Sequence, residues 1–376
     1  MPTMETAAFE TDLSLFKYDN LERLPAAYRD LDRAERTERI ETALTELGDD
    51  VVVLGHNYQR KEIVEHADFV GDSYGLSTEA AATDAEYVIF GGVTFMAESA
   101  DIITDDDQTV MLPSMEASCP MAGMAEALQV DAAWAEITAA TDDDIVPITY
   151  MNSYADLKAF CAEQGGLVCT SSNAHKAFEW AFDRGDTVLF LPDKYLGTNT
   201  AHRLGLEDEV VEWDPWDPEG VDPERAVGND IILWEGYCQV HERFEASHVE
   251  RVRETHPEAN VVVHPECRRD VVEAADVVGS TATITETVEN ADAGETWAIG
   301  TEIHLANHLD RWNPEVEVLP LCGEACMDCN AMRQIDPNYL AWILEELVAG
   351  RERNVIEVDP ETKTLAGVAM ERMLDL

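Results

Sequence analysis

The chain has 376 residues, with 77 Asp and Glu against 25 Lys and Arg, so its formal net charge is −52. This charge would repel nucleic acids and anionic membrane surfaces, so neither is expected as a partner. No apolar run reaches the ~18 residues that a membrane helix needs, and the acidic N-terminus lacks the basic region of a secretory signal. The length indicates two or three domains, and with 45% hydrophobic residues the chain can bury a core. We therefore expect a globular protein, and one that stays in the cytoplasm.

The basic residues are unevenly divided, since only six are Lys and nineteen are Arg. An acid-rich, Lys-poor composition is typical of extreme halophiles that accumulate salt. Molar salt shortens the Debye length to about 3 Å and screens most of the self-repulsion of such a chain. A merely acidic protein of a low-salt organism is the alternative. In either case the charge indicates habitat and not function.

The chain begins with an acidic, helical N-terminal extension over residues 1–45. From residue 46 onward, a pattern of short apolar strands separated by helical stretches occurs three times. The first strand of each unit is rich in β-branched residues, as expected for a parallel strand buried on both faces. These first strands are predicted at 51–55, 144–149 and 260–264, the second strands within 67–73, 166–172 and 275–281, and the third strands within 86–92, 186–192 and 296–302.

This repeat predicts the α/β class, with three similar three-layer α/β/α domains and right-handed crossovers between parallel strands. We expect the domains to be arranged with pseudo-threefold symmetry around a central active site. The predicted boundaries are 46–122, 123–240 and 241–334, and the C-terminal helices of 335–376 are expected to complete the first domain.

Polar side chains follow the strands of each predicted unit. The first strands end in His56-Asn57-Tyr58, Tyr150-Met151-Asn152 and His264-Pro265-Glu266, and the second strands end in Ser73, Ser171 and Ser280-Thr281. Ligands of parallel sheets bind beyond the carboxyl ends of the strands, and helix N-termini with hydroxyl groups attract anions. Ordinary N-capping would explain each hydroxyl alone, but together they predict a site for a small molecule with two or three anionic groups.

Several of these side chains are candidate acids and bases, together with His241. Glu266 directly follows His264 and Pro265 at the end of a buried strand. We therefore expect a raised pKa at Glu266 and a role in proton transfer.

One cysteine in a polar, non-helical setting follows the third strand of each unit, namely Cys119, Cys238 and Cys329. Three thiols, one from each unit, fit an iron–sulfur cluster in which one iron has no protein thiolate. Such an open iron can act as a Lewis acid on a substrate oxygen. The pair Cys326 and Cys329 alone could instead be half of a zinc site or a redox pair. The other cysteines within or beside apolar segments are expected to be core residues: Cys161, Cys169 and Cys267.

Ten short motifs together make the chain resemble the quinolinate synthase family. They are GHNYQ (55–59), GDS (71–73), FGGVTFMAES (90–99), CPMA (119–122), TYMNS (149–153), CTSSNA (169–174), GYCQVH (236–241), HPEC (264–267), GST (279–281) and CNAM (329–332). The resemblance implies a central [4Fe–4S] cluster and a transferase/lyase-type reaction in NAD biosynthesis. In that reaction iminoaspartate and dihydroxyacetone phosphate give quinolinate, phosphate and two waters. An enzyme that produces iminoaspartate is implied as a further partner.

The resemblance also implies roles for individual residues. Cys119, Cys238 and Cys329 match the cluster ligands, and Cys329 is chosen because Met332 follows it at the spacing of the family motif. Glu266, Tyr58 and His241 are implied as catalytic residues. The substrate contacts fall on His56, Ser73, Tyr150, Met151, Asn152, Ser171, His264, Pro265, Glu266 and Thr281. Cys322 or Cys326 could replace Cys329 as a ligand or pair with it oxidatively.

Three other functions stay open on the sequence alone. One is a different hydro-lyase with an open iron, and another is an iron–sulfur electron carrier or sensor without turnover. The third is a zinc-stabilised binding protein that uses Cys322, Cys326 and Cys329.

Overall fold

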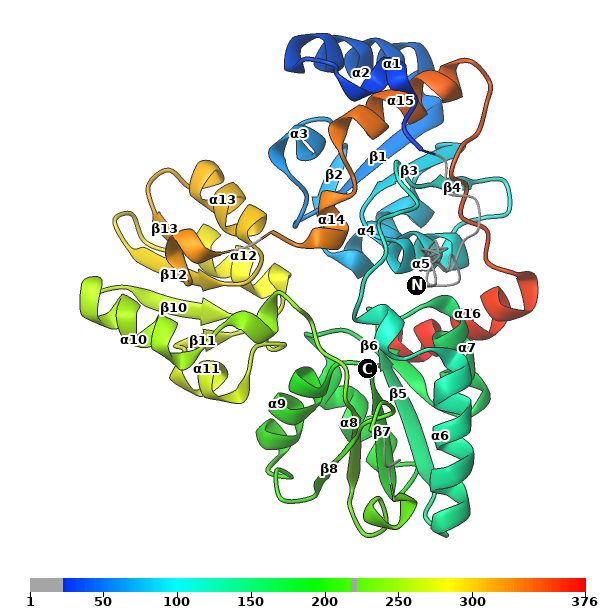
Figure 1. Ribbon diagram of the computed structural model, residues 1–376, viewed down its shortest axis with the longest axis vertical. Helices are drawn as coiled ribbons and strands as arrows, with labels where there is room; N and C mark the ends of the chain where they lie inside the picture. Colours follow the sequence, from blue (N-terminus) through cyan, green and yellow to red (C-terminus); the bar gives the residue numbers. More distant parts are fainter. Residues whose placement is uncertain (1–22, 218–221, 327) are drawn as a thin grey trace, which may run out of the picture.

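The computed structural model describes residues 23–217, 222–326 and 328–376 (Figure 1). It contains three separate sheets whose strands pair in parallel throughout. Helices lie on both sides of the sheets, so the predicted three-layer α/β class is confirmed. The predicted extension begins in the part of the chain outside the described residues. Its described part contains the helices α1 (Ala26–Arg29) and α2 (Arg33–Leu47).

The first unit has a four-stranded sheet in the order β2-β1-β3-β4. All six residues of its first strand are buried, which explains the run of valines there. Asp72 caps the following helix through the Gly75 N–H. The elements are β1 (Val51–His56), α3 (Lys61–Val64), β2 (Phe69–Gly71), α4 (Ser73–Ala82), β3 (Tyr87–Gly91), α5 (Thr94–Ile103) and β4 (Thr109–Met111).

The second unit has a five-stranded sheet in the order β6-β5-β7-β9-β8. Its elements are α6 (Ala127–Ala140), β5 (Ile145–Tyr150), α7 (Ala155–Glu163), β6 (Leu167–Cys169), α8 (Ala174–Phe182), β7 (Thr187–Leu191), α9 (Lys194–Leu204), β8 (Val210–Trp213) and β9 (Ile231–Trp234).

The third unit repeats the order of the first, β11-β10-β12-β13. Its elements are α10 (Ala246–Thr255), β10 (Asn260–Val263), α11 (Arg269–Ala274), β11 (Val277–Val278), α12 (Thr281–Glu289), β12 (Thr296–Gly300), α13 (Ile303–Trp312) and β13 (Glu317–Pro320). Helix α14 (Asn330–Arg333) follows these elements but packs on the first unit, where Ala331 and Met332 are part of the core. Short 3₁₀ helices lie at Gly48–Asp50, Ala122–Met124, Pro223–Arg225, His241–Arg243 and Gly323–Ala325.

Each sheet extends beyond the three predicted strands. A further strand pairs with the third strand of every unit, namely β4, β9 and β13. The second sheet gains β8 as well. These strands are only three or four residues long, so they carry little periodic signal.

The last two helices pack on different units. Helix α15 (Pro337–Val348) lies against α2 and the first sheet, as expected for a segment that completes the first domain. Helix α16 (Pro360–Leu374) packs chiefly on α7 and β6 of the second unit, and less on α5 of the first. Its buried face is apolar, with Ala366, Ala369 and Met370 in the core of the second unit. The structure therefore differs from the expectation that all of 335–376 joins the first domain, and the domain boundaries themselves stay a prediction.

No helix in the described ranges has the length and apolar character needed to cross a membrane.

Candidate functional site

The polar ends of the strands from all three units face one cavity of about 730 Å³. Nearly every site residue expected from the sequence lines it: His56, Tyr58, Ser73, Tyr150, Met151, Asn152, Ser171, His241, His264, Glu266, Thr281, Cys119, Cys238 and Cys329. The exception is Pro265, which is buried and lines a neighbouring cavity instead. Parallel strands that end at one edge bring these residues together.

The position of each hydroxyl residue follows from the helix that begins beside it. Ser73 is the first residue of α4, and Thr281 is the first residue of α12. Ser171 lies three residues before α8 and hydrogen-bonds with Tyr150. The N-termini of three helices therefore lie around one cavity, where their free N–H groups favour anionic groups of a ligand.

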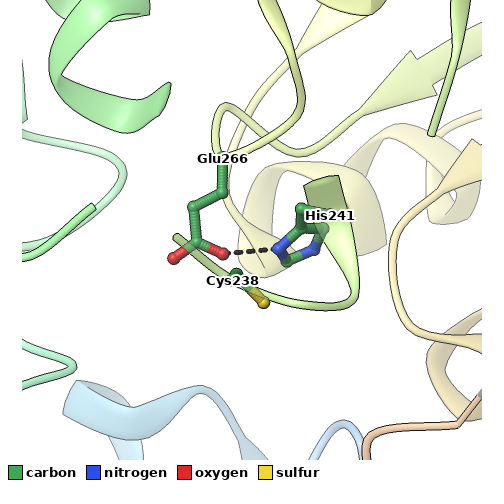
Figure 2. Close-up of side chains that lie close together, drawn as sticks. All are labelled: Cys238, His241 and Glu266. Atoms are coloured by element: carbon green, nitrogen blue, oxygen red, sulfur yellow. Dashed lines mark ion pairs between the residues drawn. The ribbon is translucent and has the colours of Figure 1, made fainter. Parts of the chain in front are cut away.

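Glu266 lies at the centre of a buried polar cluster from the third unit (Figure 2). Its Oε2 is 2.5 Å from Nδ1 of His241 and 3.3 Å from Nδ1 of His264. The two imidazole rings stack with centroids 4.4 Å apart. The carboxylate therefore lies at the edge of a stacked pair of imidazoles, where one oxygen faces Nδ1 of both rings.

The electrostatics of this cluster correct one expectation from the sequence. Burial alone raises the pKa of Glu266, but His264 and His241 outweigh burial and hold that pKa below its ordinary value. The expected raised pKa is therefore wrong, because the sequence did not show that two imidazoles would face one carboxylate. Burial also lowers the pKa of His56 to about 3, so this imidazole is neutral at physiological pH.

A hydroxyl that the sequence analysis did not single out joins two of the expected catalytic residues. Thr301 Oγ1 lies 2.7 Å from the Tyr58 hydroxyl and 2.9 Å from Nε2 of His241. It is buried and directly follows β12, at the carboxyl end of the third strand of its unit. Its position at the end of a predicted strand could have identified it from the sequence as a candidate site residue. A continuous polar path therefore leads from Tyr58 through Thr301 and His241 to Glu266.

The thiols of Cys119, Cys238 and Cys329 are free and lie between two cavities. They line the 730 Å³ cavity and also a second one of about 1040 Å³, which reaches Arg243, Phe244 and His248. Backbone N–H groups two or three residues further along the chain face each sulfur, at Met121 and Ala122, at His241, and at Ala331 and Met332. Burial nevertheless raises the pKa of all three thiols, to about 12 at Cys119.

Comparison with known proteins agrees with this arrangement over nearly the whole chain. The family model described as "Quinolinate synthetase A protein" matches residues 38–375. The chain belongs to this family. It is 80% identical to a quinolinate synthase of Haloarcula marismortui over 99% of this chain and 100% of that relative. It is 79% identical to that of Halobacterium salinarum over the same shares. It is 51% identical to that of Acidobacterium capsulatum over 90% of this chain and 92% of the relative. Two of these relatives come from halophiles, which agrees with the Lys-poor composition.

The donor atoms of this family member fit an iron–sulfur cluster better than a single metal ion held by three thiols. The ligand atoms of one tetrahedral zinc lie about 3.8 Å apart when all are sulfur, given Zn–S bonds of about 2.3 Å. Among the described residues, the three thiols do not all come within 4.8 Å of one another. This wider spacing, one thiol per unit, and the backbone N–H groups aimed at each sulfur suit a polynuclear cluster.

Two fully buried carboxylates hold the loops that carry these cysteines in the second and third units. Asp193 and Glu302 each cap the helix that follows the third strand of their unit, α9 and α13. An oxygen of Asp193 accepts the Cys238 N–H at 3.0 Å, and an oxygen of Glu302 accepts the Cys329 N–H at 3.0 Å. The same structural position in two units therefore fixes the backbone of a candidate ligand.

In the first unit a threonine, and not a carboxylate, holds the loop that carries the cysteine. Thr94 is the first residue of α5, and both its N–H and its hydroxyl donate to the carbonyl of Ala117, two residues before Cys119. Thr94, Asp193 and Glu302 were not predicted from the sequence as functional residues. All three lie just after the third strand of their unit, and this position is the signal that could have identified them.

Changing Asp193 to Asn should destabilise the fold by about 1–3 kcal/mol, which is the usual effect of one buried N–H without an acceptor. The Asp193 side chain accepts from both Leu196 N and Cys238 N, whereas an amide has one acceptor oxygen. The free energy of unfolding would be measured by denaturant titration of the cluster-free protein in molar KCl. Asp32→Asn is the matched control, because Asp32 caps α2 at an exposed site and should change stability by less than about 0.5 kcal/mol.

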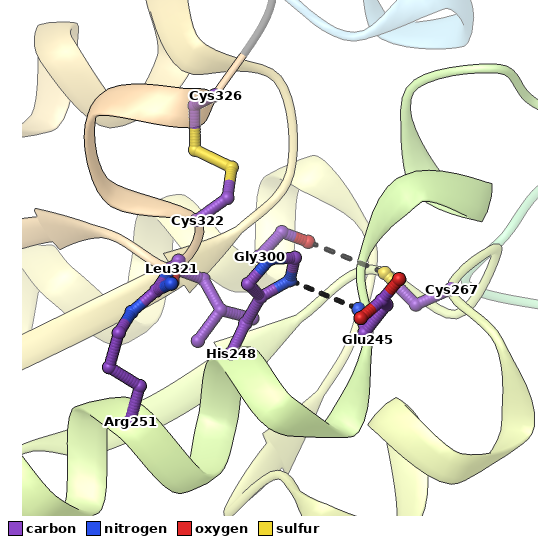
Figure 3. Close-up of a disulfide and its surroundings, with 8 residues drawn as sticks. All are labelled: Glu245, His248, Arg251, Cys267, Gly300, Leu321, Cys322 and Cys326. Atoms are coloured by element: carbon purple, nitrogen blue, oxygen red, sulfur yellow. Dashed lines mark hydrogen bonds between the residues drawn. A yellow bond between two sulfur atoms is a disulfide. The ribbon is translucent and has the colours of Figure 1, made fainter.

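A disulfide joins Cys322 to Cys326 in the segment between β13 and α14 (Figure 3). The 3₁₀ turn Gly323–Ala325 brings their Cα atoms to 5.1 Å, within the range that a disulfide spans. The bond lies above α10, where Arg251 donates to the Leu321 carbonyl. These two cysteines therefore pair with each other, and Cys329 stays free to act as a ligand. The remaining cysteines, Cys161, Cys169 and Cys267, are buried core residues as expected.

Proposed function

We propose that this chain is a quinolinate synthase that joins iminoaspartate to dihydroxyacetone phosphate, with loss of phosphate and two waters. The observation that carries the proposal is that the strand ends of all three units and three free thiols line one cavity. The full-length relatives bear the name of this activity. The acidic chain is proposed to work in the cytoplasm, close to an enzyme that supplies the unstable iminoaspartate.

The polar side chains of the cavity divide into two tasks. Ser73, Ser171 and Thr281, with the helix N-termini beside them, would hold the phosphate and the carboxylates of the substrates. His56, Tyr150 and Asn152 would orient the carbon skeleton from the ends of the first strands. Met151 shapes the wall of the site and contributes no charge, whereas Pro265 would act from behind by holding the turn between His264 and Glu266.

We assign proton transfer to the connected polar groups around Glu266. Glu266 lines the cavity and its lowered pKa keeps it ionised, so this carboxylate is the proposed acceptor of a proton from substrate. His241 and Thr301 connect it to the Tyr58 hydroxyl, so a proton taken up at one end can be returned at the other.

Cys119, Cys238 and Cys329 would hold a [4Fe–4S] cluster against this cavity. When bound, the cluster supplies a Lewis acid at the one iron without a protein thiolate. Asp193, Glu302 and Thr94 keep the three cysteine loops in place around it.

The test is to purify the protein anaerobically in molar salt, determine metal and acid-labile sulfide, and supply both substrates. We expect about four iron and four sulfide per chain and quinolinate identified by mass spectrometry. Zinc without sulfide would contradict the cluster. A loaded cluster that dehydrates other hydroxy acids but makes no quinolinate would favour a different open-iron hydro-lyase.

A further inference from the structure

Cys238, His241 and Glu266 form the most compact set of metal-binding side chains in the described part of the chain. One ligand atom from each lies within 4.8 Å of the other two. Figure 2 shows the three side chains close together, the cysteine and histidine from one segment and the glutamate from the loop after β10. Cys119 and Cys329 do not belong to this set.

One atom of this set, Oε1 of Glu266, is buried without a partner. Nδ1 of His241 has the other carboxylate oxygen, Oε2, as its ion-pair partner at 2.5 Å and makes no further contact with a polar group. Buried polar atoms are rarely left unpaired, since each costs free energy. An unpaired carboxylate oxygen beside an imidazole nitrogen and a free thiol indicates a place for a cation.

The donor set is that of zinc. A thiolate, an imidazole nitrogen and a carboxylate oxygen are its common ligands, at about 2.3, 2.0 and 2.1 Å. These bond lengths place ligand atoms about 3.3–3.6 Å apart around a tetrahedral ion. The spacing in the structure is at most 4.8 Å, so the ligand atoms would have to approach one another by about 1 Å to bind the ion. A water would complete four-coordination from the open 730 Å³ cavity.

We propose that the cluster-free chain binds a single zinc ion through Cys238, His241 and Glu266. Binding releases the thiol proton of Cys238 to solvent and involves no redox change. Cys238 is also a proposed cluster ligand, so zinc and cluster exclude one another. Zinc would in addition occupy Glu266 and His241, the groups assigned to proton transfer. The zinc site itself does not depend on the proposed reaction, whereas its competition with the cluster rests on the proposed ligand set.

The experiment titrates the full-length, cluster-free protein with Zn²⁺ against a chromophoric chelator in molar KCl under reducing, anaerobic conditions. We expect one zinc per chain, and at least tenfold weaker binding in each of Cys238→Ser, His241→Asn and Glu266→Gln. Cys119→Ser should keep the wild-type zinc affinity but fail to assemble a cluster. This variant also shows that a lost cluster does not mean a lost fold.

Two results would overturn the proposal. Loss of zinc binding in Cys119→Ser would assign the ion to the three thiols, and unchanged affinity in Glu266→Gln would remove the carboxylate from the site. A second measurement tests the competition. Zinc-loaded protein should take up at least tenfold less iron during reconstitution with iron and sulfide than metal-free protein, and protein with its cluster in place should bind no zinc at this site. Equal iron uptake would contradict the exclusion, whatever the enzyme then does with its substrates.

Discussion

Changing Glu266 to Gln should lower the rate of quinolinate formation by about 10²–10⁴-fold, the range of a lost general acid or base. The amide has the size of the carboxylate, so the cavity and the stacked pair His241 and His264 should keep their places. The glutamine amide cannot accept a proton at neutral pH. The polar path from Tyr58 through Thr301 and His241 therefore no longer ends at an ionised group. Initial rates of quinolinate formation at saturating substrates would measure the effect.

Iron and sulfide content provide the internal control for this variant, because Glu266 is not a proposed cluster ligand. Both should equal those of the unchanged protein. Glu254→Gln is the matched charge control, since Glu254 is an exposed residue of α10 far from any proposed role. If Glu266→Gln turns over at the normal rate with a full cluster, Glu266 is not the base.

Changing Cys329 to Ser should lower the iron content from about four to less than one per chain and reduce activity to background. A serine oxygen is a poor substitute for a thiolate, and Cys267, the other free thiol described in the third unit, does not line the cavity. The Glu302 carboxylate would still accept the N–H of residue 329, so the loop should keep its position. Metal analysis and visible absorption of anaerobically purified protein measure the loss.

The double change Cys322→Ser and Cys326→Ser is the matched control, because it removes two sulfurs from the same segment. Iron content and activity should stay within twofold of the unchanged protein. The free energy of unfolding should fall by about 2 kcal/mol, the loop-entropy value for a closed loop of about five residues. A double variant that loses its iron would mean that Cys322 or Cys326 is a ligand, and the assignment of Cys329 would then be wrong.

The sequence predicted the parts of the site that lie at the ends of long, apolar strands. His56 and Tyr150 end β-branched runs and Glu266 follows one; such runs favour buried strands, and parallel pairing then determines where these residues meet. The three single cysteines were found by the same repeat. The fourth strands were missed because three or four residues give no clear period.

Other features of the site could not be predicted from the sequence, because they depend on contacts that form only in the folded chain. The low pKa of Glu266 depends on His264, close by in the sequence, and also on His241, which lies in another loop. Thr301 gains its importance through its contacts with Tyr58, 243 residues away, and with His241. The Cys322–Cys326 bond depends on a local 3₁₀ turn that composition does not reveal. Pairwise distances of this kind are set by tertiary packing, which a single sequence does not encode in any periodic signal.

The two C-terminal helices have a consequence for the order in which the protein can fold during synthesis. Arg372 of α16 donates to the Ala162 carbonyl across 210 residues, and Tyr28 bonds with Glu345 of α15 across 317 residues. The apolar faces that these helices cover therefore stay bare until the ribosome has made the end of the chain. The sheet of the third unit, in contrast, lies within residues 260–320 and needs neither helix. The third sheet can therefore form before synthesis ends, whereas the contacts of α15 and α16 with the first and second units form only when the chain is nearly complete, and long-range pairing of this kind is slow.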